Sequence, residues 1–85
     1  MATPDHRGFV LDLAVMRALA TNGGMTAVEL GDRIGTDPVT IGRVCRHLQR
    51  EESIHITATG ECQLTAAGRG RLRTHRRLST DTPRP

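Results

Sequence analysis

Three arginines with helical spacing are the residues of this chain best suited to binding a charged ligand. Arg43, Arg46 and Arg50 follow one another at intervals of three and four residues, which places them on one stripe of a helix. A guanidinium donates hydrogen bonds in a planar fork that matches a phosphate group or the O6 and N7 atoms of guanine. The stripe therefore indicates recognition of a polyanion, and nucleic acid is the natural candidate.

The distribution of charge along the chain indicates the same kind of partner. All twelve basic residues are arginine, against nine acidic residues, and the net charge is +3. Residues 43–85 carry nine of the arginines and four acids, whereas residues 1–42 carry three arginines and five acids. A strongly basic half beside a mixed half fits a nucleic-acid partner better than a membrane surface.

The helix that carries the stripe has clear start signals. Asp37 is placed to cap it, and Pro38 is suited to its first position, where the missing N–H has no consequence. Gly42 lies in mid-helix and costs about 1 kcal/mol relative to alanine, which close packing on the preceding helix or close approach to DNA could offset. The inward face is expected to contain Ile41, Val44 and Leu48, with Cys45 at its margin.

Two helices are expected before it. The first runs from Gly8 to Thr21 and stops at Asn22–Gly24. The second begins at Thr26, which forms a capping box with Glu29, and it ends at Gly35. Apolar residues at helical spacing form the inner faces of these helices and a hydrophobic staple at the second: Phe9, Leu13, Val15, Met16, Leu19, Ala20, Met25, Leu30 and Ile34.

A short hairpin and a last helix are expected after it. Residues 54–57 and 62–65 each alternate apolar and polar side chains, and Gly60 lies in the turn between them. Thr65 then caps a helix from Ala66 to about Leu78 that is rich in arginine. The expected domain therefore spans residues 9–78, with a flexible lead-in at 1–8 and a disordered tail at 79–85.

This order of elements, mainly α with a small β-hairpin, resembles a winged helix-turn-helix with a three-helix core, a wing and a C-terminal helix. The run from Ile34 to Arg43 is similar to the helix-turn-helix of bacterial winged-helix regulators. The run from Gln63 to Arg69 is similar to the segment after the wing in MarR-like regulators. The resemblance implies duplex DNA binding as a dimer, with the third helix in the major groove. We expect the protein to be a cytoplasmic, nucleoid-associated bacterial repressor.

The resemblance also assigns roles to individual residues. The base-contact candidates lie early in the third helix, and arginine is the strongest of them because it can grip guanine with two hydrogen bonds. The hairpin tip, residues 58–61, has one acid and no cation, so we expect the wing to contribute little on DNA. The base-contact candidates are Val39, Thr40 and Arg43, and the phosphate-contact candidates are Arg46, His47, Arg50, Arg69, Arg71 and Arg73.

Other functions find less support in the sequence. No acid, histidine and nucleophile share a recognisable catalytic spacing, so we expect no enzymatic activity and no cofactor. The spacing of the cysteines and histidines matches no metal site, and Cys45 and Cys62 are too few for a disulfide framework. The polar N-terminus and the lack of a long apolar run indicate neither a signal peptide nor a membrane span.

Three alternatives to transcriptional regulation stay open. A winged helix can also dock a protein partner through the same exposed helix or the wing. Small winged helices also occur in replication or partition complexes of mobile elements, and RNA is a further possible ligand. Steep salt dependence would indicate phosphate contacts, whereas a docking surface of mixed charge would give a shallow dependence.

Overall fold

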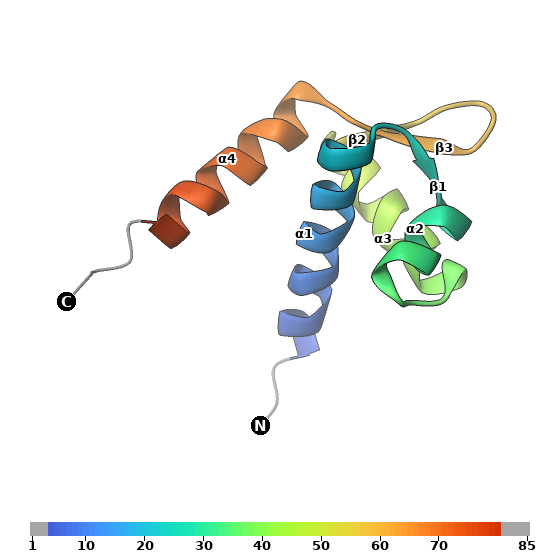
Figure 1. The fold of residues 1–85 in the computed structure, drawn as a ribbon, viewed down its shortest axis with the longest axis horizontal. Helices are drawn as coiled ribbons and strands as arrows, with labels where there is room; N and C mark the ends of the chain where they lie inside the picture. Colours follow the sequence, from blue (N-terminus) through green and yellow to red (C-terminus); the bar gives the residue numbers. More distant parts are fainter. Residues whose placement is uncertain (1–3, 81–85) are drawn as a thin grey trace.

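The computed structural model describes the backbone of residues 4–80 and the side chains of residues 10–74. Over this range the chain is mainly helical with a small antiparallel sheet, which confirms the α+β class (Figure 1). The predicted lead-in at residues 1–3 and the predicted tail at residues 81–85 lie outside the described residues. The elements in chain order are α1 (Pro4–Asn22), β1 (Met25–Thr26), α2 (Ala27–Ile34), α3 (Pro38–Arg50), β2 (Ile54–Ile56), β3 (Glu61–Leu64) and α4 (Ala66–Thr80).

Both terminal helices are longer than the sequence pattern predicts. α1 begins at Pro4 instead of Gly8, so residues 4–8 are helical where a flexible lead-in was expected. Proline suits the first turn of a helix because the N–H that it lacks would have no partner there. α4 continues to Thr80, two residues past the expected end at Leu78. In Figure 1, α1 lies between α4 on one side and the α2–α3 pair on the other, and α4 diverges from α1 towards its C-terminal end.

An aliphatic core joins α1, α2, α3 and the sheet, as the composition predicts. Cys45 is 2% exposed and lies within this core, not at its margin, whereas Val44 is only partly buried. Ala20, expected on the inner face of α1, is exposed, and the side chain of Phe9 lies outside the described part. The most deeply buried side chains of this core are Val15, Met16, Leu19, Leu30, Ile41, Cys45, Leu48, Ile54 and Cys62, and the polar Ser53 is fully buried as well.

The predicted cap of α2 is confirmed. The Thr26 hydroxyl accepts from the backbone N–H of Glu29 at 3.2 Å, and the Glu29 carboxylate accepts from the Thr26 N–H at 2.9 Å. Gly35 ends the helix in the left-handed conformation, with a φ of 87°. These local bonds fix where α2 begins and ends, and they therefore set the short turn that leads into α3.

The sheet contains a third strand, β1, that the sequence pattern does not predict. β1 pairs with β3, Met25 opposite Cys62 and Thr26 opposite Glu61, so β3 is the central strand between β1 and β2. Two residues are too few to show an alternating pattern.

At the other edge of the sheet, the Gln49 side chain of α3 accepts from the backbone N–H of Ile56 on β2 at 2.7 Å. This bond satisfies a donor that would otherwise face an open strand edge.

Two glycines allow backbone segments to approach closely. A Cβ on Gly31 would lie 2.5 Å from the Thr36 carbonyl oxygen, so this glycine permits the tight turn between α2 and α3. A Cβ on Gly68 would overlap the Ser53 carbonyl group, so the first turn of α4 packs directly on the chain after α3. Gly42, in contrast, has open space around its Cβ position. Close packing on α2 therefore does not explain a glycine at position 42.

α3 ends without the glycine that commonly closes a helix. Glu52 takes the left-handed conformation, with a φ of 63°. The N–H of Ser53 donates to the Leu48 carbonyl at 2.9 Å and the N–H of Glu52 to the Gln49 carbonyl at 2.9 Å, the two bonds of a Schellman motif. A side chain is strained in this conformation because its Cβ crowds the following carbonyl oxygen.

Replacing Glu52 with glycine is therefore expected to stabilise the fold. Glycine adopts a positive φ without the Cβ penalty, and we expect the free energy of unfolding to rise by about 1 kcal/mol. Urea denaturation followed by circular dichroism measures the change. Glu52→Ala is the control, because it removes the exposed carboxylate and keeps the Cβ. Equal stability of the glycine and alanine variants would show that the backbone at this position is not strained.

Candidate nucleic-acid interface

α3 presents a cationic ridge to solvent. We define the α3 ridge as Val39, Arg43, Arg46 and Arg50, and all four side chains are exposed, as their spacing predicts. Ile41 and Leu48, on the opposite side of the helix, are fully buried and hold it against the core. Within residues 10–74, no ion pair or side-chain hydrogen bond involves the three ridge guanidiniums. The described side chains therefore leave the donors of these guanidiniums available to an external ligand.

The start of α3 is held by Asp37. Its carboxylate accepts from the Thr40 backbone N–H at 2.9 Å and from the Thr40 hydroxyl at 2.8 Å. The bond from the Thr40 backbone is the main reason that the pKa of Asp37 lies below its ordinary value. The cap therefore contributes its full stabilisation above the ordinary pKa and loses it as the pH falls through the lowered one. Thr40, a base-contact candidate, has its hydroxyl hydrogen committed to this cap.

His47 lies beside two carboxylates on the flank of α3. Its Nε2 is 3.3 Å from Glu51 Oε2 on the same helix and 3.9 Å from Asp12 Oδ2 on α1. Burial raises the pKa of Asp12, and the nearby His47 and Arg71 act in the opposite direction. These acids compete with any phosphate for the imidazole, so His47 is a weaker phosphate-contact candidate than the sequence pattern indicates.

Arg71 is used within the protein. Its Nη1 donates to Glu51 Oε1 at 2.9 Å and to the hydroxyl of the fully buried Ser53 at 2.7 Å. The side chain thereby ties α4 to the end of α3. Arg71 is therefore not the phosphate contact that the arginine-rich sequence of α4 predicts, because its guanidinium is bound within the protein. The spacing indicates a different role for Arg71. Arg69 and Arg73 are four residues apart and share one face of the helix, whereas Arg71 lies between them on another face.

Exchanging Arg71 for glutamine should therefore affect stability more than ligand binding. The Arg71–Glu51 pair is partly exposed, so we expect the free energy of unfolding to fall by only about 1 kcal/mol. Arg73→Gln is the matched control and should leave stability almost unchanged, since Arg73 is exposed with no ion pair within the described residues. Thermal denaturation of both variants measures the difference. Equal melting temperatures would contradict a structural role for Arg71.

Arg69 and Arg73 form a second cationic region, on α4. Both are exposed, and together with Ala20 and Leu72 they line a cavity of about 180 Å³ between α1 and α4. They belong to a different helix from the α3 ridge. Their predicted contact with phosphate stays a prediction.

The hairpin tip contains no cation. Its turn is closed by Gly60, with a φ of 90°, and by the Thr57 hydroxyl, which accepts from the Glu61 backbone N–H at 3.1 Å. Ala58, Thr59 and Gly60 are exposed. The expectation that this tip contributes little to binding DNA stays a prediction.

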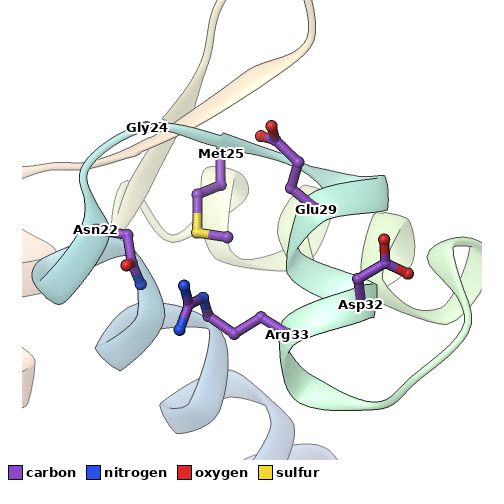
Figure 2. Close-up of a pocket in the computed structure, with 6 residues that line it drawn as sticks. All are labelled: Asn22, Gly24, Met25, Glu29, Asp32 and Arg33. Carbon is purple, nitrogen blue, oxygen red and sulfur yellow. The ribbon is translucent and has the colours of Figure 1, made fainter.

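A shallow pocket lies between the end of α1 and α2 (Figure 2). Two of its four polar side chains serve the protein's own backbone: Asn22 donates to the Ala18 carbonyl, and Glu29 belongs to the cap of α2. In Figure 2 the Arg33 side chain extends towards the end of α1, and the Asp32 carboxylate points away from the Arg33 guanidinium. The pocket measures about 640 Å³ and is lined by Asn22, Gly24, Met25, Glu29, Asp32 and Arg33, which include no nucleophile or general base beyond the two carboxylates.

The two cysteines are free and buried. The Cys45 thiol interacts with that of Cys62, which raises the pKa of Cys45 and lowers that of Cys62. Among the described residues, no group of three histidine, cysteine or acidic side chains is arranged to hold a metal ion.

Comparison of the chain with protein-family models, curated proteins and solved structures gives no match. Within the described part of the chain, no helix has both the length and the apolar character needed to cross a membrane. Function is therefore inferred from the exposed α3 ridge and its setting in the fold.

Proposed function

We propose that this chain is a small winged-helix protein that binds duplex DNA and regulates transcription as a repressor. The observation that carries the proposal is the α3 ridge, whose three guanidiniums are exposed and have no partner within the described residues. The helix beneath it is held by a capped turn and a buried inner face, so the guanidiniums project from a rigid support. The order of helices and hairpin supports a winged helix-turn-helix.

In this proposal α3 enters the major groove, where one of its arginines contacts a base and two contact phosphates. Arg43, near the middle of the helix, donates to the O6 and N7 atoms of a guanine. Arg46 and Arg50 lie further along and bind phosphates, which fix the register of the protein on the duplex. The open space at Gly42 is consistent with close approach of DNA, because no side chain of the protein occupies it.

We also propose that two copies pair on DNA. α1 and α4 diverge from each other (Figure 1), and Val10 on α1 is 52% exposed, so these helices offer surface outside the helix-turn-helix. Sedimentation of the protein with and without DNA tests pairing. Monomers at micromolar concentration in both cases would rule out a palindromic site bound by a dimer.

Removing one phosphate-binding arginine should change the salt dependence of binding. For Arg50→Ala we expect weaker binding to all duplexes and a slope of log K against log salt that is less steep by about 0.9, the value for one phosphate contact. Fluorescence anisotropy between low and moderate salt measures the slope. Arg33→Ala, on the exposed surface of α2, is the control for the loss of one positive charge. An unchanged slope would exclude Arg50 from the phosphate contacts.

Selection from a pool of random duplexes tests the proposal as a whole. We expect one short motif to be enriched, and we expect duplex DNA of that sequence to outcompete both its single strands and duplex RNA. Enrichment of no sequence, with a shallow salt dependence, would overturn the proposal and favour a protein-docking module. Preference for RNA would also overturn it. A motif confined to the origin or partition region of a mobile element would keep DNA binding and replace the repressor role.

A further inference from the structure

The start of the α3 ridge differs chemically from the rest of it. Val39 is 65% exposed, the highest value among the exposed large apolar residues of the described chain. It lies four residues before Arg43, one turn away on the same stripe of the helix. The ridge therefore begins with an apolar side chain and continues with guanidiniums.

Most hydrogen-bond donors at the N-terminal end of α3 are absent or already in use. Pro38 has no N–H, and the Thr40 N–H and hydroxyl both donate to Asp37. The exposed N-terminus of a helix commonly binds phosphate through free N–H groups, but here a carboxylate occupies that position and repels a second anion. What this end can offer to a ligand is chiefly apolar contact.

Exposure of a valine is not informative by itself, because Val10 and Val28 are also exposed. The position of Val39 is informative if α3 lies in the major groove. The only apolar group on the base edges there is the 5-methyl group of thymine, and small apolar side chains contact it. Four residues of helix rise by about 6 Å, close to the spacing of two base pairs.

We infer that Val39 contacts the 5-methyl group of a pyrimidine, so that the preferred site has a methylated pyrimidine about two base pairs from the guanine bound by Arg43. This inference rests on the proposed function. In ordinary DNA the pyrimidine is thymine, and 5-methylcytosine presents the same methyl group. The contact sets specificity at one position, which no phosphate contact does.

The test removes one methyl group at a time. The duplex selected by the wild-type protein is prepared with uracil in place of thymine at each position in turn, and affinities are measured for the wild type, Val39→Ala and Val28→Ala. We expect uracil at one position to weaken wild-type binding about fourfold, the effect of losing one methyl-sized apolar contact. Val39→Ala should bind the thymine and uracil duplexes equally, whereas Val28→Ala, an equally conservative change on α2, should keep the fourfold difference.

A second pair of duplexes tests whether 5-methylcytosine supplies the same methyl contact as thymine. At the sensitive position, cytosine and 5-methylcytosine are each placed opposite guanine. We expect the wild type to prefer the methylated form and Val39→Ala to show no preference. The inference is overturned if the wild type binds thymine and uracil duplexes equally at every position, or if Val39→Ala keeps the uracil effect. If selection enriches no duplex, the proposed function fails and the inference fails with it.

Discussion

Replacing Arg43 with alanine is expected to weaken binding to the selected duplex by about 1 to 3 kcal/mol and to relax base choice at one position. Arg43 is exposed at the middle of the α3 ridge, and within the described residues its guanidinium has no partner in the protein. In the groove it would hold guanine through two parallel hydrogen bonds. Loss of both bonds removes the preference for guanine over the other bases, so the penalty falls mainly on the preferred sequence.

Binding to a panel of duplexes, each changed at one position, separates this role from simple charge loss. The Arg43→Ala variant should bind the guanine duplex and its substituted forms with similar affinity, while the wild type discriminates among them. Arg17→Ala, which removes an exposed charge from α1, should retain the discrimination. If Arg43→Ala binds all duplexes more weakly by the same factor, Arg43 contacts phosphate and another residue selects the base.

Replacing Gly68 with alanine is expected to have the largest effect on stability. A Cβ at this position would overlap the Ser53 carbonyl group and the Leu64 side chain. Because the obstacle includes backbone, α4 must shift, and the bond from the Thr65 N–H to the Ser53 carbonyl at 3.1 Å would be strained. The Arg71 bond to the Ser53 hydroxyl depends on the same arrangement. We expect the free energy of unfolding to fall by about 3 kcal/mol, which is at the upper end for overpacking. The melting temperature should then fall by roughly 12 to 24 °C.

Gly70 provides a matched control on the same helix. A Cβ at this position meets no other atom within 4 Å, so Gly70→Ala should increase the free energy of unfolding by about 1 kcal/mol through helix propensity alone. Thermal denaturation followed by circular dichroism measures both variants. A Gly68→Ala variant as stable as Gly70→Ala would show that α4 does not pack on Ser53 as described.

The features that the sequence predicted well depend on neighbouring residues. The capping box of Thr26 and Glu29, the left-handed Gly35 and the Asp37 cap each involve residues within a few positions, and all three are present. The exposed stripe of α3 followed from helical spacing, which also depends only on local order. These local signals fixed the helix that carries the candidate site.

The features that the sequence missed depend on contacts between distant segments. β1 forms because Met25 pairs with Cys62 on β3. Arg71 has a structural role because it donates a hydrogen bond to Glu51, twenty positions earlier in the chain. The functional groups of Arg69, Arg71 and Arg73 are identical, so only packing shows which one is used internally. Cys45 and Val44 are neighbours near the edge of one helical face, and which of them enters the core depends on how α3 rotates against α1 and the sheet.

Chemical modification of the arginines, with and without the selected duplex, tests most directly whether the α3 ridge faces DNA. Phenylglyoxal reacts with accessible guanidiniums, and mass spectrometry reports the extent of reaction at each site. DNA should protect Arg43, Arg46 and Arg50 and leave Arg17 and Arg33 reactive, while Arg71 should react slowly in both cases because it is bound to Glu51 and Ser53. Equal modification of Arg43, Arg46 and Arg50 with and without DNA would contradict the assignment of α3 as the DNA-binding helix.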